Sequence, residues 1–153
     1  MELDLSGVGI RNLSKELFQY IFLTGLYLQY NQLTILPNEI SQLTSLIYLD
    51  VSHNNLKAIP KDISKCKNLQ QFNLFRNMIT SVPPELALLV DLNDLSLDEN
   101  PLVEPFLSLK NKGTLEILAF LRNSKGMRKK KKKRKDKRGE KSFIIFNFSI
   151  SMN

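Results

Sequence analysis

Residues 26–46 read LYLQYNQLTILPNEISQLTSL, and this stretch is one copy of a unit that recurs along the chain. Asparagines stand at intervals of 23 residues, at Asn31, Asn54, Asn77 and Asn100. Apolar residues keep the same interval in three further columns: Leu3, Leu26, Leu49, Phe72 and Leu95; Leu5, Leu28, Val51, Leu74 and Leu97; Ile10, Leu33, Leu56, Ile79 and Leu102. A shared period in this many columns indicates an internal repeat, which decides the fold before any local pattern does.

The residue types within one unit predict its local structure. Leu26 and Leu28 alternate with polar neighbours, which is the period of a short strand. The Asn31 amide can satisfy backbone groups that a turn leaves unpaired, and Pro37 ends any local ladder because it has no N–H. Apolar residues at every third position after Pro37 then bring the chain back along the outer face. One such coil cannot bury its own apolar side, so neighbouring units must stack into a continuous core.

On these residues the chain resembles the intracellular leucine-rich-repeat proteins of the 23-residue class, over roughly residues 2–122. The resemblance implies an α/β solenoid with a short-stranded parallel sheet on its concave face, used mainly to bind other proteins. Scaffolding of signalling complexes and targeting of phosphatases are among the roles it implies. We predict five units and a C-terminal helical cap over residues 1–122, followed by a basic, disordered tail over residues 123–153.

The first and last units depart from the pattern. In the first unit Val8 replaces the asparagine and Ser14 replaces the proline, so this unit is either a frayed cap or a sign that the chain is a shortened form of a longer repeat protein. In the last unit, residues 113–122 predict a helix that closes the solenoid. Thr114 can cap that helix, and its apolar face is expected to contain Leu115, Leu118, and Leu121 or Arg122.

Residues between the inward leucines should point into the concave face, because side chains alternate along a strand. Aromatic and basic residues gather there in the middle three units, with acidic residues in the outer two. Aromatic residues and arginine are enriched at interface hot spots, which predicts a partner-binding patch. The alternative is a cross-strand ladder of aromatics with no partner. The candidate residues are Tyr27, Tyr30, Tyr48, His53, Phe75 and Arg76.

Charge is divided unevenly along the chain. Residues 1–121 carry 9 basic and 13 acidic side chains, whereas residues 122–141 carry 13 basic and 2 acidic ones. Such a basic run suits nuclear import, contact with nucleic-acid phosphates or attraction to anionic lipid, and it could also bind the acidic rim of its own solenoid. Residues 142–150 are apolar but too short to span a membrane, so they either assist surface anchoring or have no role. The tail's electrostatic candidates are Arg128, Lys129, Lys130, Lys131, Lys132, Lys133, Arg134 and Lys135.

The sequence predicts no enzyme, cofactor, metal or small-molecule substrate. His53 is the single histidine, and Cys66 stands in a column of leucines, so a buried side chain is expected there rather than a nucleophile. Gly7 and Gly9 lack the third glycine of a dinucleotide-binding loop. With neither a signal-peptide pattern nor paired cysteines, we expect a cytoplasmic or nuclear protein that binds another protein.

Overall fold

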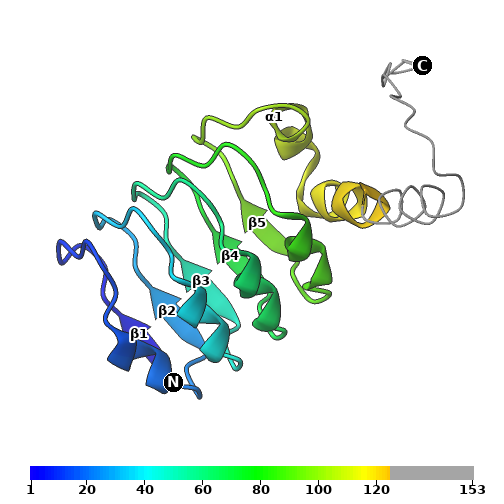
Figure 1. Ribbon diagram of the computed structural model, residues 1–153. Helices are drawn as coiled ribbons and strands as arrows, with labels where there is room; N and C mark the ends of the chain where they lie inside the picture. Colours follow the sequence, from blue (N-terminus) through cyan, green and yellow to red (C-terminus); the bar gives the residue numbers. More distant parts are fainter. Residues whose placement is uncertain (125–153) are drawn as a thin grey trace, which may run out of the picture.

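The computed structural model describes residues 1–124 and consists of repeating coils stacked in chain order (Figure 1). Each coil contributes one strand to a single parallel sheet of order β1-β2-β3-β4-β5. The strands are β1 (Glu2–Asp4), β2 (Gly25–Tyr27), β3 (Tyr48–Asp50), β4 (Gln71–Asn73) and β5 (Asp94–Ser96). The predicted five-unit solenoid is confirmed over these residues.

Short 3₁₀ helices form the side of the solenoid opposite the sheet (Figure 1). A 3₁₀ helix has three residues per turn, which explains the apolar spacing of three after each proline: Ile40 is fully buried within η2, and Leu43 and Leu46 follow it into the core. Extended prolines precede three of these helices. The four are η1 (Lys15–Gln19), η2 (Asn38–Gln42), η3 (Lys61–Lys65) and η4 (Pro84–Leu88).

The strand leucines pair in register at the repeat interval. Leu3 pairs with Leu26, Leu26 with Leu49, and Leu49 with Phe72. Leu26 and Leu49 are completely buried. Phe72 stands in the same column and is a further apolar side chain of the core. One continuous core therefore runs between the sheet and the 3₁₀ helices, as stacking of incomplete units requires.

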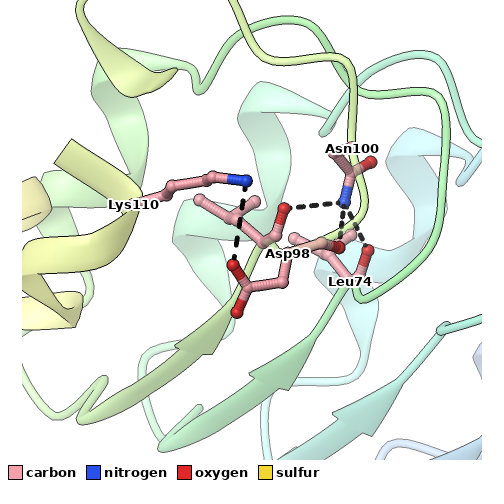
Figure 2. A network of polar contacts seen from close by, with 5 residues as sticks. Leu74, Asp98, Asn100 and Lys110 are labelled. Carbon is pink, nitrogen blue, oxygen red and sulfur yellow. Dashed lines mark hydrogen bonds and ion pairs between the residues drawn. The ribbon is translucent and has the colours of Figure 1, made fainter. Parts of the chain in front are cut away.

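The asparagine column joins each unit to the one before it. The Asn54 side chain accepts from the backbone N–H of Leu33 at 2.9 Å and donates to the carbonyl of Leu28 at 2.9 Å, both in the preceding unit. It also donates to the Val51 carbonyl of its own unit at 3.1 Å. Asn100 repeats the arrangement at the last unit, where its amide nitrogen faces the carbonyls of Leu74 and Asp98 (Figure 2). These buried amides therefore satisfy backbone groups that the turns leave unpaired.

The residue before each asparagine adopts a left-handed backbone conformation. The φ angle is 58° at Tyr30, 51° at His53 and 55° at Arg76, and Gly7 holds the equivalent position in the first unit. This turn directs the chain off the strand, so bulky side chains stand at positions where glycine is the relaxed choice.

The C-terminal end is closed by helical segments: α1 (Phe106–Leu109), η5 (Lys110–Lys112) and a helix over residues 114–124. The Thr114 hydroxyl does not cap its helix as predicted. Gly113 precedes the helix and its carbonyl accepts from Ile117 N–H, whereas the Thr114 oxygen accepts from the Leu95 N–H on β5 at 2.9 Å. Thr114 therefore pairs a backbone group at the edge of the sheet.

The predicted apolar face of this last helix was partly wrong. Leu118 and Leu121 are buried, but Leu115 is 72% exposed and Ile117 is buried in its place. The helix begins at Thr114, which is bonded to β5, and it buries residue 117 instead of residue 115. Arg122 Nε reaches the Ala87 carbonyl at 3.5 Å, which ties the helix back to η4.

The first unit is more open than the middle units. Leu3, Leu5, Ile10 and Leu13 pack against the core but stay only partly buried. Val8, which replaces the asparagine, is 63% exposed. Among residues 1–124 no helix is long and apolar enough to cross a membrane.

Candidate functional site: the concave face

The concave face of the sheet contains a hollow of about 680 Å³ over β2 to β5. Three rows of side chains follow from the register. Tyr48, Gln71 and Asp94 form the first row, and Asp50, Asn73 and Ser96 form the second. The third lies two residues further along the chain, at Ser52 and Phe75. The lining comprises Gln29, Tyr30, Tyr48, Asp50, Ser52, His53, Gln71, Phe72, Asn73, Phe75, Asp94 and Ser96.

Aromatic rings stand on either side of this hollow. Tyr27 and Tyr48 lie with ring centroids 5.0 Å apart, on neighbouring strands. Past the strand ends, Tyr30 stacks on His53 at 4.2 Å, and His53 meets Phe75 edge-on at 5.3 Å. These contacts are cross-strand, as the ladder alternative expected, yet Tyr30 remains 62% exposed. The ladder therefore presents aromatic surface to solvent instead of burying it.

The structure brings together four of the six predicted partner-binding residues. Tyr30, Tyr48, His53 and Phe75 line the hollow. Tyr27 reaches it only by contact with Tyr48. Arg76 is separate: it lies in an adjoining shallow depression, with its neighbours including His53, Met78 and Glu99.

Asp50 forms the floor between the two aromatic groups, and the sequence prediction did not single it out. Only 7% of Asp50 is exposed. One carboxylate oxygen accepts from the Ser52 N–H at 2.8 Å, and the other accepts from Tyr48 Oη at 3.2 Å and Asn73 Nδ2 at 2.9 Å. The signal was present in the Asp-x-Ser sequence, which Asp4 and Ser6 repeat with a 2.9 Å bond, because short acidic side chains often accept from the N–H two residues on.

Burial and neighbouring carboxylates raise the pKa of two tyrosines on the concave face. Burial, followed by the Asp50 carboxylate that its hydroxyl contacts, raises the pKa of Tyr48 to about 12. Burial, then Glu2, likewise raises the pKa of Tyr27. Both side chains therefore stay neutral hydrogen-bond donors at physiological pH.

Cys66 lies in the core, away from the concave face. Its thiol is completely buried and donates to the Ile40 carbonyl at 3.2 Å. Burial raises the pKa of the thiol to about 11, which removes the thiolate that nucleophilic chemistry needs. Within residues 1–124, no three His, Cys, Asp or Glu side chains are grouped so as to hold a metal ion.

The repeat geometry coincides with a known family. The sequence matches the leucine rich repeat family over residues 1–56 and again over residues 46–102. The chain belongs to the leucine-rich-repeat family. Solved structures agree: a leucine-rich-repeat protein of Leptospira interrogans aligns with 39% identity and a TM-score of 0.64, over 68% of this chain and 26% of that one. The BIR2 ectodomain of Arabidopsis thaliana aligns with 30% identity and a TM-score of 0.60, over 65% of this chain and 55% of that one.

Curated relatives match a shorter segment. The CCR4-Not complex 3'-5'-exoribonuclease subunit Ccr4 of Schizosaccharomyces pombe is 53% identical over 45 residues, which is 29% of this chain and 6% of that protein. The same subunit of Saccharomyces cerevisiae is 54% identical over 44 residues, which is 29% of this chain and 5% of that protein. The matched segment thus spans about 6% of the length of these relatives and less than a third of this chain.

The electrostatic candidates of the tail, Arg128 to Lys135, lie outside the described residues, as do the apolar residues 142–150.

Proposed function

We propose that this chain is a non-catalytic adaptor or scaffold that binds another protein in the hollow of its concave face. The aromatic cluster at that hollow carries the proposal. Tyr30, His53 and Phe75 come from three successive units and present their rings side by side without filling the hollow. Large, rigid rings around a concavity supply contact area at a low cost in conformational entropy.

The backbone beneath the cluster supports the same interpretation. Tyr30 and His53 of the cluster, like Arg76 and Glu99 outside it, stand at left-handed positions, which cost on the order of 1 kcal/mol or more each for residues other than glycine. Gly7 shows that the repeat accepts glycine at this position. Strained bulky residues gathered at one surface are typical of functional sites.

The comparisons support a binding role in an assembly and carry no activity with them. The relatives named Ccr4 are subunits of the CCR4-Not complex, and their resemblance to this chain is confined to a short repeat segment. A structural neighbour from Arabidopsis thaliana, BIR3, is in complex with SERK2. We place the present chain inside the cell, cytoplasmic or nuclear, where its buried free thiol is stable.

The alternative function is peripheral binding of anionic membrane or nucleic acid through the basic run at residues 128–138. It has support from the sequence alone, because ten of those eleven residues are Lys or Arg.

A quantitative pull-down from cell lysate separates the two. The intact chain is compared with a Tyr48→Glu/Phe75→Glu variant and with a chain ending at Asn123. An Ile35→Glu/Val90→Glu variant is the matched control, because it adds the same charge at apolar residues that are 68% and 73% exposed and lie outside the hollow. Each variant is first checked for folding by circular dichroism.

We expect partners of the intact chain to fall at least about tenfold with the concave variant, the effect of losing roughly 1.4 kcal/mol or more at a hot spot. The control variant and the shortened chain should retain them. Loss on shortening alone would overturn the proposal and assign the function to the tail.

A further inference from the structure

The hollow is lined by hydrogen-bond acceptors and aromatic rings and contains no lysine or arginine. Two carboxylates line it, at Asp50 and Asp94, and both belong to rows that run straight across the sheet. Two basic side chains, Lys110 and Arg76, lie outside the hollow beside other acidic residues. Lys110 approaches Asp98 at 4.0 Å (Figure 2), and Arg76 lies in the adjoining depression with Glu99. A ligand of the hollow must therefore bring its own positive charge, and phosphate groups of a nucleic acid would be repelled.

The floor has capacity for one more donor. An ionised carboxylate has about four acceptor positions, and Asp50 uses three of them, for the Ser52 N–H, the Tyr48 hydroxyl and the Asn73 amide. Asp94 is exposed and forms no ion pair within residues 1–124. A cation that meets the exposed Asp94 carboxylate and the remaining acceptor position of Asp50 would not displace any bond of the fold.

The walls suit a flat cation. Tyr48 stands on one side of the floor, paired with Tyr27, and Phe75 stands on the other, against His53. A guanidinium group stacks on aromatic faces while its N–H groups bond to carboxylates in its own plane. A lysine ammonium has no plane to stack and is more strongly hydrated, so it gains less from the same walls.

We propose that the hollow is a recognition site for an arginine side chain presented by the protein partner, with Asp50 and Asp94 as its counter-charges and Tyr48 and Phe75 as its walls. The inference rests on the proposed function, because it names the chemistry of the partner at the same surface. It is independent of how many other contacts the partner makes.

The test is an NMR titration of the full-length ¹⁵N-labelled chain with an acetylated, amidated Gly-Arg-Gly peptide. Matched peptides contain citrulline, which has the same shape without the charge, or lysine. The Ser52 amide is the direct reporter, because its N–H donates to the Asp50 carboxylate at 2.8 Å. Asp50→Asn removes the charge from the floor, and Asp4→Asn is its control, since Asp4 accepts from the Ser6 N–H at 2.9 Å in the same kind of turn but lies outside the hollow.

We expect the arginine peptide to shift the Ser52 amide and to bind about tenfold more tightly than the citrulline peptide, the loss expected for one charge-assisted hydrogen bond with a cation–π contact. The lysine peptide should be weaker than arginine, and Asp50→Asn, but not Asp4→Asn, should weaken the arginine peptide by a similar factor. Equal binding of the citrulline peptide, binding of lysine as tight as that of arginine, or an unaffected Asp50→Asn variant would each overturn the proposal.

Two further outcomes keep this inference separate from the proposed function. If Tyr48→Glu/Phe75→Glu abolishes partner capture while Asp50→Asn leaves it unchanged, the concave face binds protein but the arginine site is wrong. A response of residues 128–138 to Asp50→Asn with no peptide added would make the chain's own basic run the occupant and overturn the assignment to a partner.

Discussion

The two ends of the solenoid differ in how completely they cover the apolar core. At the C-terminal end, the helix over residues 114–124 buries Ile117, Leu118 and Leu121, and the Thr114 hydroxyl takes the Leu95 N–H at the edge of β5. At the N-terminal end, β1 is the edge strand of the described sheet, and Leu3, Leu5 and Leu13 of its unit are only partly buried. Residues in the same column of the repeat are thus buried to different extents, depending on what packs against their unit.

The asparagine column explains why the first unit tolerates valine. Each asparagine pairs with backbone groups of the unit before it: Asn31 accepts from the Ile10 N–H at 2.9 Å and donates to the Leu5 carbonyl at 2.8 Å. No unit precedes the first within residues 1–124, so an asparagine at Val8 would have no such groups to serve. At the other end, the Leu102 N–H has no following asparagine and donates to the Asn100 carbonyl instead, at 2.8 Å. The comparison indicates that the asparagine column stabilises the contact between one unit and the next, in addition to the turn of its own unit.

The largest expected effect is in the leucine column. Leu49→Ala should lower the free energy of unfolding by about 2–5 kcal/mol, because Leu49 is completely buried and the two adjoining units limit relaxation. Leu3→Ala, in the same column, should cost about 1 kcal/mol, since Leu3 is partly exposed and has a neighbouring strand on one side only. Urea unfolding followed by far-ultraviolet circular dichroism measures both. Equal costs would show that the N-terminal unit is as tightly enclosed as the middle.

The asparagine column should show the same gradient on a smaller scale. Asn54→Ala should cost about 2–3 kcal/mol, because the buried Leu33 N–H loses its acceptor. Asn31→Ala should cost less, about 1 kcal/mol, since its bonds to Ile10 and Leu5 are only part-buried. The same urea experiment compares the pair, with Asn55→Ala, an exposed neighbour outside the column, as control. A larger loss of unfolding free energy for Asn31→Ala than for Asn54→Ala would contradict the role given to the asparagine column.

The fold could be predicted from the sequence because it depends on periodicity. Four columns at one interval fix which residues face inward, and the register of Leu3 with Leu26 and of Leu49 with Phe72 follows directly. The end of the solenoid was harder. Leu115 and Ile117 both fit an apolar helical stripe with Leu118 and Leu121, so the residue spacing does not tell which of the two is buried. Nor does the spacing predict the contact of Thr114 with β5.

The sequence predicted which residues lie on the concave face, but not the contacts that their side chains make. Strand alternation places Tyr48 and Phe75 on the concave face, and this placement is found. It does not reveal that Arg76 lies in a separate depression, since Tyr30 and His53 occupy the equivalent positions with the same left-handed backbone and do line the hollow. Nor does it reveal that Asp50 is nearly covered by its neighbours, since an acidic residue on an exposed row is ordinarily solvated.

The smallest of these effects concerns the C-terminal end of the solenoid, where the Thr114 hydroxyl pairs the Leu95 N–H. Thr114→Val keeps the shape of the side chain but removes the acceptor for the Leu95 N–H, so it should cost about 1–2 kcal/mol. Thr114→Ser keeps the oxygen and should cost less than about 0.5 kcal/mol, as its loss is one methyl group of a partly buried residue. Hydrogen exchange of the Leu95 amide gives a second, local readout: protection should fall in the valine variant and persist in the serine variant. If the valine variant keeps both its stability and its protected amide, burial of Ile117, Leu118 and Leu121 alone closes the sheet, and the hydroxyl is incidental to the difference between the two ends.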